Sequence, residues 1–100
     1  MTNIRKLLEN NGFEVTKESD GYSLQQYTPA GEDWNLYFEK LTDIKSYAEG
    51  FDPEEEFEIW VEAKIHGYPT MRASIPCYSE LWQDQLWKQE LLQNIANKIK

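Results

Sequence analysis

The first forty residues combine one short helical repeat with three stretches in which apolar and polar residues alternate. Ile4, Leu7 and Leu8 recur at helical spacing, and Asn10-Asn11-Gly12 stops the pattern, which predicts a short first helix. Three segments with a period of two follow, at residues 13–18, 22–26 and 34–38, separated by turns rich in Gly, Pro or Asp. They predict an antiparallel sheet with one apolar face, formed by Val15 or Phe13, Leu24, Trp34, Leu36 and Phe38, which helices must cover.

From Thr42 onward the apolar spacing becomes helical. A short helix is predicted with Thr42 as its cap and with Ile44, Tyr47 and Ala48 inside it, ending at Gly50. The next helix has a complete N-terminal signature: Asp52 is the N-cap, Pro53 the first helical residue, and Glu55 occupies the capping-box position, while Phe51 precedes the cap as an apolar contact. The stripe of this helix is Phe57, Trp60, Val61 and Lys64, with Gly67 as the expected C-cap.

A long terminal helix is predicted from about Ser79 to Ile99, after a loop from Tyr68 to Cys77 that contains two prolines. Its stripe is Leu81, Trp82, Gln85 or Leu86, Gln89, Leu92, Ile95, Ala96 and Ile99. The pattern as a whole predicts an α+β fold, a small three-stranded antiparallel sheet packed on helices in the order α-β-β-β-α-α-α. At 100 residues the chain has the length of a single domain, residues 1–100.

Composition supports a folded and soluble protein. Hydrophobic residues make up 40% of the chain and aromatic residues 14%, well above what disordered segments contain. The single cysteine, Cys77, cannot form an internal disulfide, and the N-terminal residues lack the apolar core of a signal peptide. We therefore expect a cytoplasmic protein without a membrane-spanning segment.

The charge of the chain is concentrated in one segment. Residues 32–62 hold eleven of the eighteen acids and only two bases, Lys40 and Lys45, so this segment accounts for the whole net charge of −8. An acidic face repels nucleic acid and anionic membranes and attracts a basic protein surface. We therefore expect no direct nucleic-acid binding, which is the least favoured class because the chain has no basic stripe to contact phosphate.

The residues expected to form an interaction surface are acids that repeat along the segment and tryptophans that could anchor a partner. Glu54, Glu58 and Glu62 repeat every four residues, where like charges on one helix repel each other. The expected surface comprises Glu32, Asp33, Trp34, Glu54, Glu58, Glu62 and Trp87. It would bind a basic protein, possible partners including nucleic-acid-binding host or defence proteins whose DNA it would imitate. Plain solubility explains the same acids and stays open as the alternative.

Catalytic and metal chemistry have weaker support, and we expect neither a catalytic residue nor a metal or cofactor. One alternative is a small hydrolase that uses His66 and Cys77, which border the same loop. Another is a metal site formed by Glu58, Glu62 and His66 on one side of a helix, although adjacent positions on a straight helix rarely surround an ion. A structural homo-oligomer formed through the terminal helix is a further possibility.

Two segments carry a resemblance. One is the turn Tyr27-Thr28-Pro29-Ala30-Gly31-Glu32-Asp33-Trp34. The other is the helix that begins Phe51-Asp52-Pro53-Glu54-Glu55-Glu56 and continues through Trp60-Val61-Glu62-Ala63-Lys64. Both resemble a largely uncharacterised family of small acidic proteins from gut bacteria and their mobile elements. The resemblance covers about two-thirds of the chain, and the loop from Tyr68 to Cys77 departs from it by being longer. It implies a bacterial or phage setting and no established enzyme activity.

Overall fold

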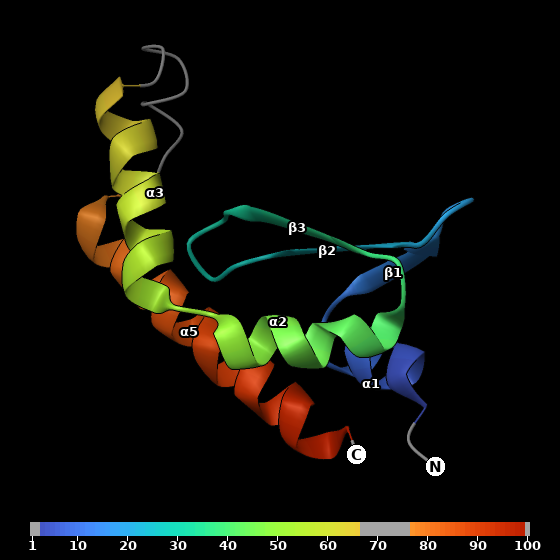
Figure 1. Ribbon diagram of the computed structural model, residues 1–100. Helices are drawn as coiled ribbons and strands as arrows, with labels where there is room; N and C mark the ends of the chain where they lie inside the picture. The colour runs from blue at the N-terminus through green and yellow to red at the C-terminus, as the bar shows by residue number, and fades with distance from the viewer. Residues whose placement is uncertain (1–2, 67–76, 100) are drawn as a thin grey trace.

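The computed structural model describes residues 3–66 and 77–99. Its elements are α1 (Ile4–Asn10), β1 (Glu14–Lys17), β2 (Tyr22–Tyr27), β3 (Asp33–Phe38), the 3-10 turn η1 (Leu41–Asp43), α2 (Ile44–Gly50), α3 (Pro53–His66) and α5 (Tyr78–Lys98) (Figure 1). The predicted α+β fold and its element order are confirmed. The expected cap at Gly67 and the expected loop up to Pro76 lie outside the described residues.

The sheet is a meander in which β1 pairs with β2 and β2 with β3, both antiparallel. Val15 lies opposite Leu24, and Leu24 lies opposite Leu36, so the three side chains form one row across the inner face. The turn into β2 requires Gly21, because a Cβ atom there would lie 2.6 Å from the carbonyl oxygen of Phe38. The register is therefore fixed by an apolar row on one face and by a close backbone approach at one end.

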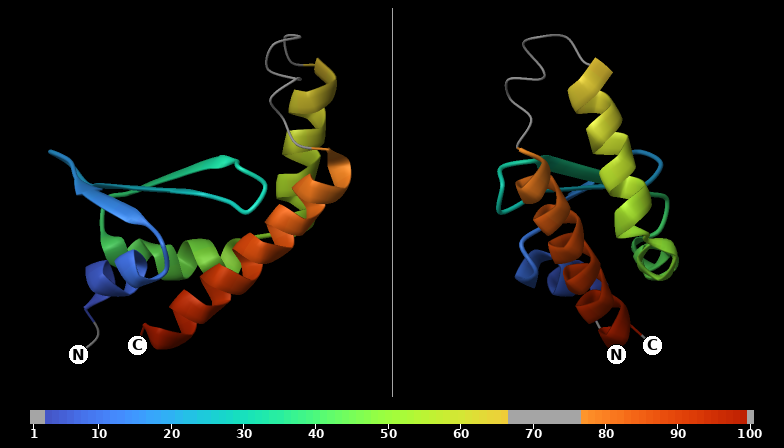
Figure 2. Two further views of the ribbon diagram at one scale, coloured as in Figure 1. Left: turned by 180° about the vertical axis from the view of Figure 1, so that it is seen from behind. Right: turned by 90° about the vertical axis from the view of Figure 1, so that its left-hand side faces the viewer.

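The core lies between this inner face and a layer of helices. Figure 2 shows α1 and α2 on one side of the sheet, with the C-terminal half of α5 beside them. The buried cluster comprises Leu8, Phe13, Val15, Leu24, Trp34, Ile44, Ala48, Leu92, Ile95 and Ile99. The cluster thus draws apolar residues from α1, the sheet, α2 and the C-terminal half of α5 and none from α3, while Leu36 and Phe38 of the predicted apolar face are only partly buried. We call the sheet, α1, η1, α2 and residues 89–98 of α5 the body.

The second region is an arm, made of α3 and residues 78–88 of α5, that extends away from the body (Figures 1 and 2). The two helices lie side by side, and the rings of Phe57 and Trp82 meet edge to face with centroids 5.4 Å apart. No residue of α3 is buried. The molecule measures 46 × 28 × 20 Å, so the arm makes it longer than it is wide.

The N-cap of α3 is the one that the sequence predicts, whereas the predicted cap of α2 is not. The Glu54 N–H donates to Asp52 Oδ1 at 3.0 Å, which confirms Asp52 as the N-cap of α3. Phe51 packs on Tyr47 of α2, with a centroid distance of 6.0 Å. Thr42 does not cap α2, because it lies inside η1, where Asp43 accepts the Lys40 N–H at 3.2 Å.

Candidate functional site

The most acidic surface is the side of α3 that faces away from α5. Seven of its residues are exposed, and at 100° per residue they occupy one continuous side of the helix. This outer face of α3 comprises Glu54, Glu55, Glu58, Ile59, Glu62, Ile65 and His66. The structure therefore places Glu54, Glu58 and Glu62 together on one exposed surface, as their spacing predicts.

Two isoleucines interrupt the acids on this face. Ile59 is 56% exposed and Ile65 is 48% exposed, whereas most large apolar residues of the chain are at least partly covered. Ile59 also lines a groove of about 550 Å³, together with Glu55, Phe57, Glu58, Val61 and Glu62. These isoleucines were not among the residues expected at the interaction surface, although both lie off the predicted Phe57-Trp60-Val61-Lys64 stripe, which indicates exposure.

The acids of the outer face keep most of their charge uncompensated. Among the described residues, no ion pair involves Glu54, Glu55 or Glu58. Glu62 lies 3.2 Å from His66 Nε2, but both side chains are about 70% exposed, so the pair is weak. The face thus combines exposed negative charge with two exposed isoleucines.

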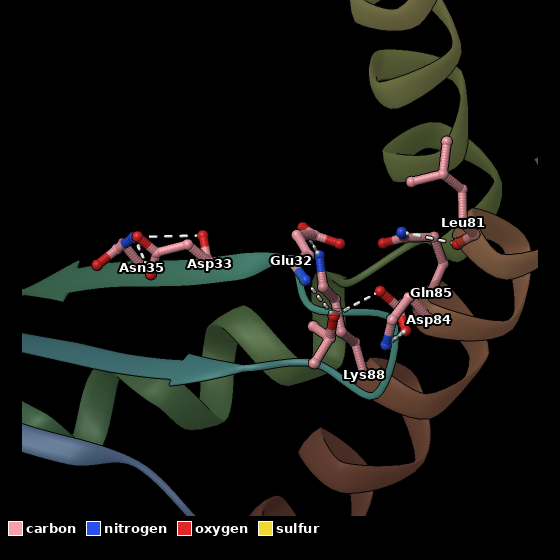
Figure 3. Close-up of polar contacts among 9 residues, drawn as sticks. Glu32, Asp33, Asn35, Leu81, Asp84, Gln85 and Lys88 are labelled. Carbon is pink, nitrogen blue, oxygen red and sulfur yellow. Dashed lines mark hydrogen bonds and ion pairs between the residues drawn. The ribbon is translucent and has the colours of Figure 1, made fainter. Parts of the chain in front are cut away.

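Glu32 and Trp34 do not belong to this surface, so their predicted place in an exposed interaction site is wrong. Glu32 is 6% exposed and Trp34 is 4% exposed. The turn between β2 and β3 reaches α5 and carries the Glu32 carboxylate to Lys88, at a distance of 2.6 Å (Figure 3). Lys88 Nζ also lies 5.2 Å from the ring centroid of Trp34. Both residues therefore help to hold the turn against α5.

A second contact fixes the same turn. The Thr28 hydroxyl donates to Asp84 at 2.5 Å, and the Ala30 N–H donates to the other oxygen of that carboxylate at 3.2 Å. Thr28 Oγ1 in turn accepts the Glu32 N–H at 2.9 Å. We call Thr28, Glu32, Asp84 and Lys88 the buried polar cluster.

The charges of this cluster do not balance. It contains two carboxylates and one ammonium group, all in side chains that are almost completely covered. Burial raises the pKa of Glu32, and the nearby Asp84 raises it further, against the lowering effect of Lys88. Lys88 is the one ammonium group of the cluster and pairs with Glu32, whereas the Asp84 carboxylate is held by the Thr28 hydroxyl and the Ala30 N–H. Together these contacts hold the β2–β3 turn against α5.

The remaining predicted interaction residues divide between the surface and the core. Asp33 is exposed at the start of β3, where its carboxylate accepts from Gln25 at 2.9 Å and from Asn35 at 3.0 Å (Figure 3). Trp87 is half-buried and meets Trp34 edge to face, with centroids 6.1 Å apart. It packs onto the core and remains partly exposed, so its role as an apolar anchor stays a prediction.

The groups proposed for catalysis or metal binding are not brought together. Cys77 is exposed, with its sulfur 3.4 Å from the Ser79 hydroxyl, while His66 pairs with Glu62. No hydrogen bond joins Cys77 to His66 in the described part of the chain. Within residues 3–66 and 77–99, no group of three His, Cys, Asp or Glu side chains is arranged to hold a metal ion.

Across the same residues, no helix has the combined length and apolar character that crossing a membrane requires. Comparison of the chain with protein-family models, with curated proteins and with solved structures finds no match. The resemblance to small acidic bacterial proteins therefore stays a prediction.

Proposed function

We propose that this protein is a non-enzymatic interaction module whose outer face of α3 binds a basic protein surface. The observation that carries the proposal is the composition of that face: it holds four exposed carboxylates, three of which line the groove beside Ile59, and a second exposed isoleucine, Ile65. Charged residues steer a partner of opposite charge, while a central apolar contact that loses water on binding supplies most of the affinity.

The energetics of the fold support a binding role for the acids. Glu54, Glu58 and Glu62 lie one turn apart on an exposed face, where each like-charged pair destabilises the helix by a few tenths of a kcal/mol. Their side chains are exposed, so they contribute little to packing. Binding a basic partner would relieve this repulsion, and the proposed partner is a protein with a basic surface, such as one that binds nucleic acid.

The test compares three forms of the protein as baits in a bacterial lysate, at low and at moderate salt. The first is the wild type, and the second carries Glu54→Lys, Glu58→Lys and Glu62→Lys. The third carries Glu14→Lys, Glu39→Lys and Glu90→Lys, which change the net charge equally at exposed positions outside α3. We expect the wild type and the third form to retain a basic protein at low salt, and the second form to lose it.

A further variant separates charge from apolar contact. Ile59→Ser removes the exposed apolar group and keeps every carboxylate, so it should weaken capture of the same partner without changing its dependence on salt. Equal capture by all forms would overturn the proposal, and the acids would then serve solubility alone.

A further inference from the structure

The sharp bend between α2 and α3 encloses a pocket. Gly50 ends α2 and Pro53 begins α3, so Phe51 and Asp52 form the elbow between the two helices (Figure 1). The pocket at this elbow has a volume of about 270 Å³ and is lined by Tyr47, Phe51, Asp52, Glu55 and Glu56, with Ser46 and Gly50 at its edge. Its volume is just below the range of about 300–1,000 Å³ that is typical of pockets for drug-sized ligands, so it has room for a small group such as one side chain.

One wall of this elbow pocket is aromatic and held in place by the body. The rings of Tyr47 and Phe51 lie 6.0 Å apart with an interplanar angle of 56°. Phe38 of β3 packs edge to face on the other side of Tyr47, at 5.7 Å. Burial raises the pKa of Tyr47, and the Glu56 carboxylate raises it further, so the phenol is neutral at physiological pH. Neutral aromatic rings present a negative face that attracts cations.

The other wall is acidic. Asp52, Glu55 and Glu56 all contribute to it, and the Asp52 carboxylate is oriented by the bond from the Glu54 N–H to Oδ1. No ion pair involves these three acids within the described residues. Glu56 and Tyr47 line the same pocket, so this carboxylate and the aromatic wall border one space. A ligand in the pocket would therefore contact aromatic rings and carboxylates together.

We infer that the elbow pocket binds the cationic side chain of a lysine or arginine. An alkyl stem would pack on Tyr47 and Phe51, and the charged head would meet the acidic wall, which is the complement that an ammonium or guanidinium group requires. The inference that a cation binds here depends only on the residues that line the pocket. That the cation comes from the basic partner rests on the proposed function, and it would give that partner one defined anchor residue.

The pocket can be tested without the partner. n-Butylammonium and n-butylguanidinium reproduce the two side chains, n-butanol has the same stem without a charge, and sodium chloride controls for ionic strength. Backbone amide NMR shifts of residues 46–56 report binding. We expect both cations to shift these amide signals in a saturable way, while n-butanol and sodium chloride produce no saturable shift. The cation that binds with the higher affinity identifies lysine or arginine as the preferred side chain.

Isosteric variants assign the binding to this pocket. Glu55→Gln with Glu56→Gln removes two carboxylates from its wall, and Glu58→Gln with Glu62→Gln removes two from the same helix outside it. The first pair should weaken the cation about tenfold and the second pair less than about twofold. Asp52→Asn keeps an acceptor for the Glu54 N–H, so it removes charge without removing the helix cap.

Blocking the pocket gives an independent result. A Cβ atom added at Gly50 would meet no atom within 4 Å beyond its own neighbours, so Gly50→Met places a side chain at the pocket without a clash. This variant should abolish the cation-dependent shifts while the remaining amide spectrum stays that of the folded wild type. The inference would be overturned if n-butanol produced the same shifts as the cations, or if both pairs of Gln substitutions reduced the affinity for the cation equally. Because no partner is needed, failure here leaves the lysate experiment on the outer face as a separate test.

Discussion

The body and the arm of this molecule are stabilised in different ways. The body is held by an apolar cluster in which Leu8, Leu24, Ile44, Leu92 and Ile95 are completely buried. The arm contains α3, with no buried residue, and the half of α5 in which the buried side chains are Leu81, Asp84, Gln85 and Lys88. Along α5, therefore, the buried side chains change from apolar in the body to mostly polar in the arm.

This difference separates stability from surface chemistry. Substitutions in the body change packing, and their cost scales with the apolar volume removed. Substitutions on the outer face of α3 leave packing unchanged, so that face can carry repelling charges and exposed isoleucines. The buried polar cluster lies where the two regions meet and holds the β2–β3 turn against α5. Four measurements would break or sharpen this comparison.

The largest effect is expected from Lys88→Met. This change leaves the carboxylates of Glu32 and Asp84 buried without a cation, which should lower the free energy of unfolding by about 3–5 kcal/mol. Glu32→Gln leaves Lys88 and Asp84 to balance each other, so its effect should be much smaller. Equilibrium unfolding in urea measures both. Equal losses in the two variants would show that the cluster depends on one ion pair and not on the balance among three charges.

The body and the arm are compared directly by two truncations. Leu92→Ala removes a completely buried side chain from the body and should cost about 2–5 kcal/mol. Val61→Ala removes a half-buried side chain from α3 and should cost about 1 kcal/mol or less. Both are measured by urea unfolding. A loss for Val61→Ala as large as that for Leu92→Ala would mean that the arm is packed as firmly as the body.

The pH dependence of the buried polar cluster has a defined sign. The pKa of Glu32 in the folded state is raised above its ordinary value of 4.5, so between these two values the folded state holds more protons than the unfolded state. Stability contributed by Glu32 is therefore present in full below pH 4.5 and is lost as the pH rises through the folded-state pKa. Urea unfolding of the wild type and Glu32→Gln at several pH values should show the wild type losing stability relative to the variant. A relative gain with rising pH would mean that Lys88 outweighs burial.

The smallest effect is expected from Glu58→Lys on the outer face of α3. The change replaces two like-charge contacts, to Glu54 and Glu62, with favourable ones, so stability should rise by about 0.5 kcal/mol. Thermal unfolding at low and high salt measures the gain, which should shrink as salt increases. A destabilised variant would show that Glu58 has a packing role that its exposure does not indicate.

Much of the fold could be predicted because it depends on local pattern. The alternation in β2 and β3 and the capping residues before α3 are signals within a few positions of one another, and the elements begin and end close to where those signals lie. The position of Glu54, Glu58 and Glu62 together on one exposed side of α3 follows from helical spacing in the same way. These predictions need no knowledge of which distant segments meet.

The wrong predictions concern residues whose burial depends on contacts with distant parts of the chain. Glu32 and Lys88 are 56 positions apart, and neither residue type is commonly buried, so nothing local indicated their pairing. The buried positions 81, 85, 88, 92 and 95 of α5 and its C-cap Ile99 alternate in steps of four and three, with the buried Asp84 beside this pattern. The predicted stripe already offered Gln85 or Leu86, and following the spacing without requiring each residue to be apolar would have placed Lys88 on the buried side as well.

The placement of the four tryptophans gives the protein an internal optical probe. Trp34 and Trp60 lie 5.2 and 5.9 Å from Lys88 Nζ, Trp87 packs on Trp34, and Trp82 packs on Phe57. All of the indole emission therefore originates in the arm or where it joins the body, and none from the far end of the sheet. Separation of the arm from the body would change the fluorescence of every indole, without any label attached to the chain.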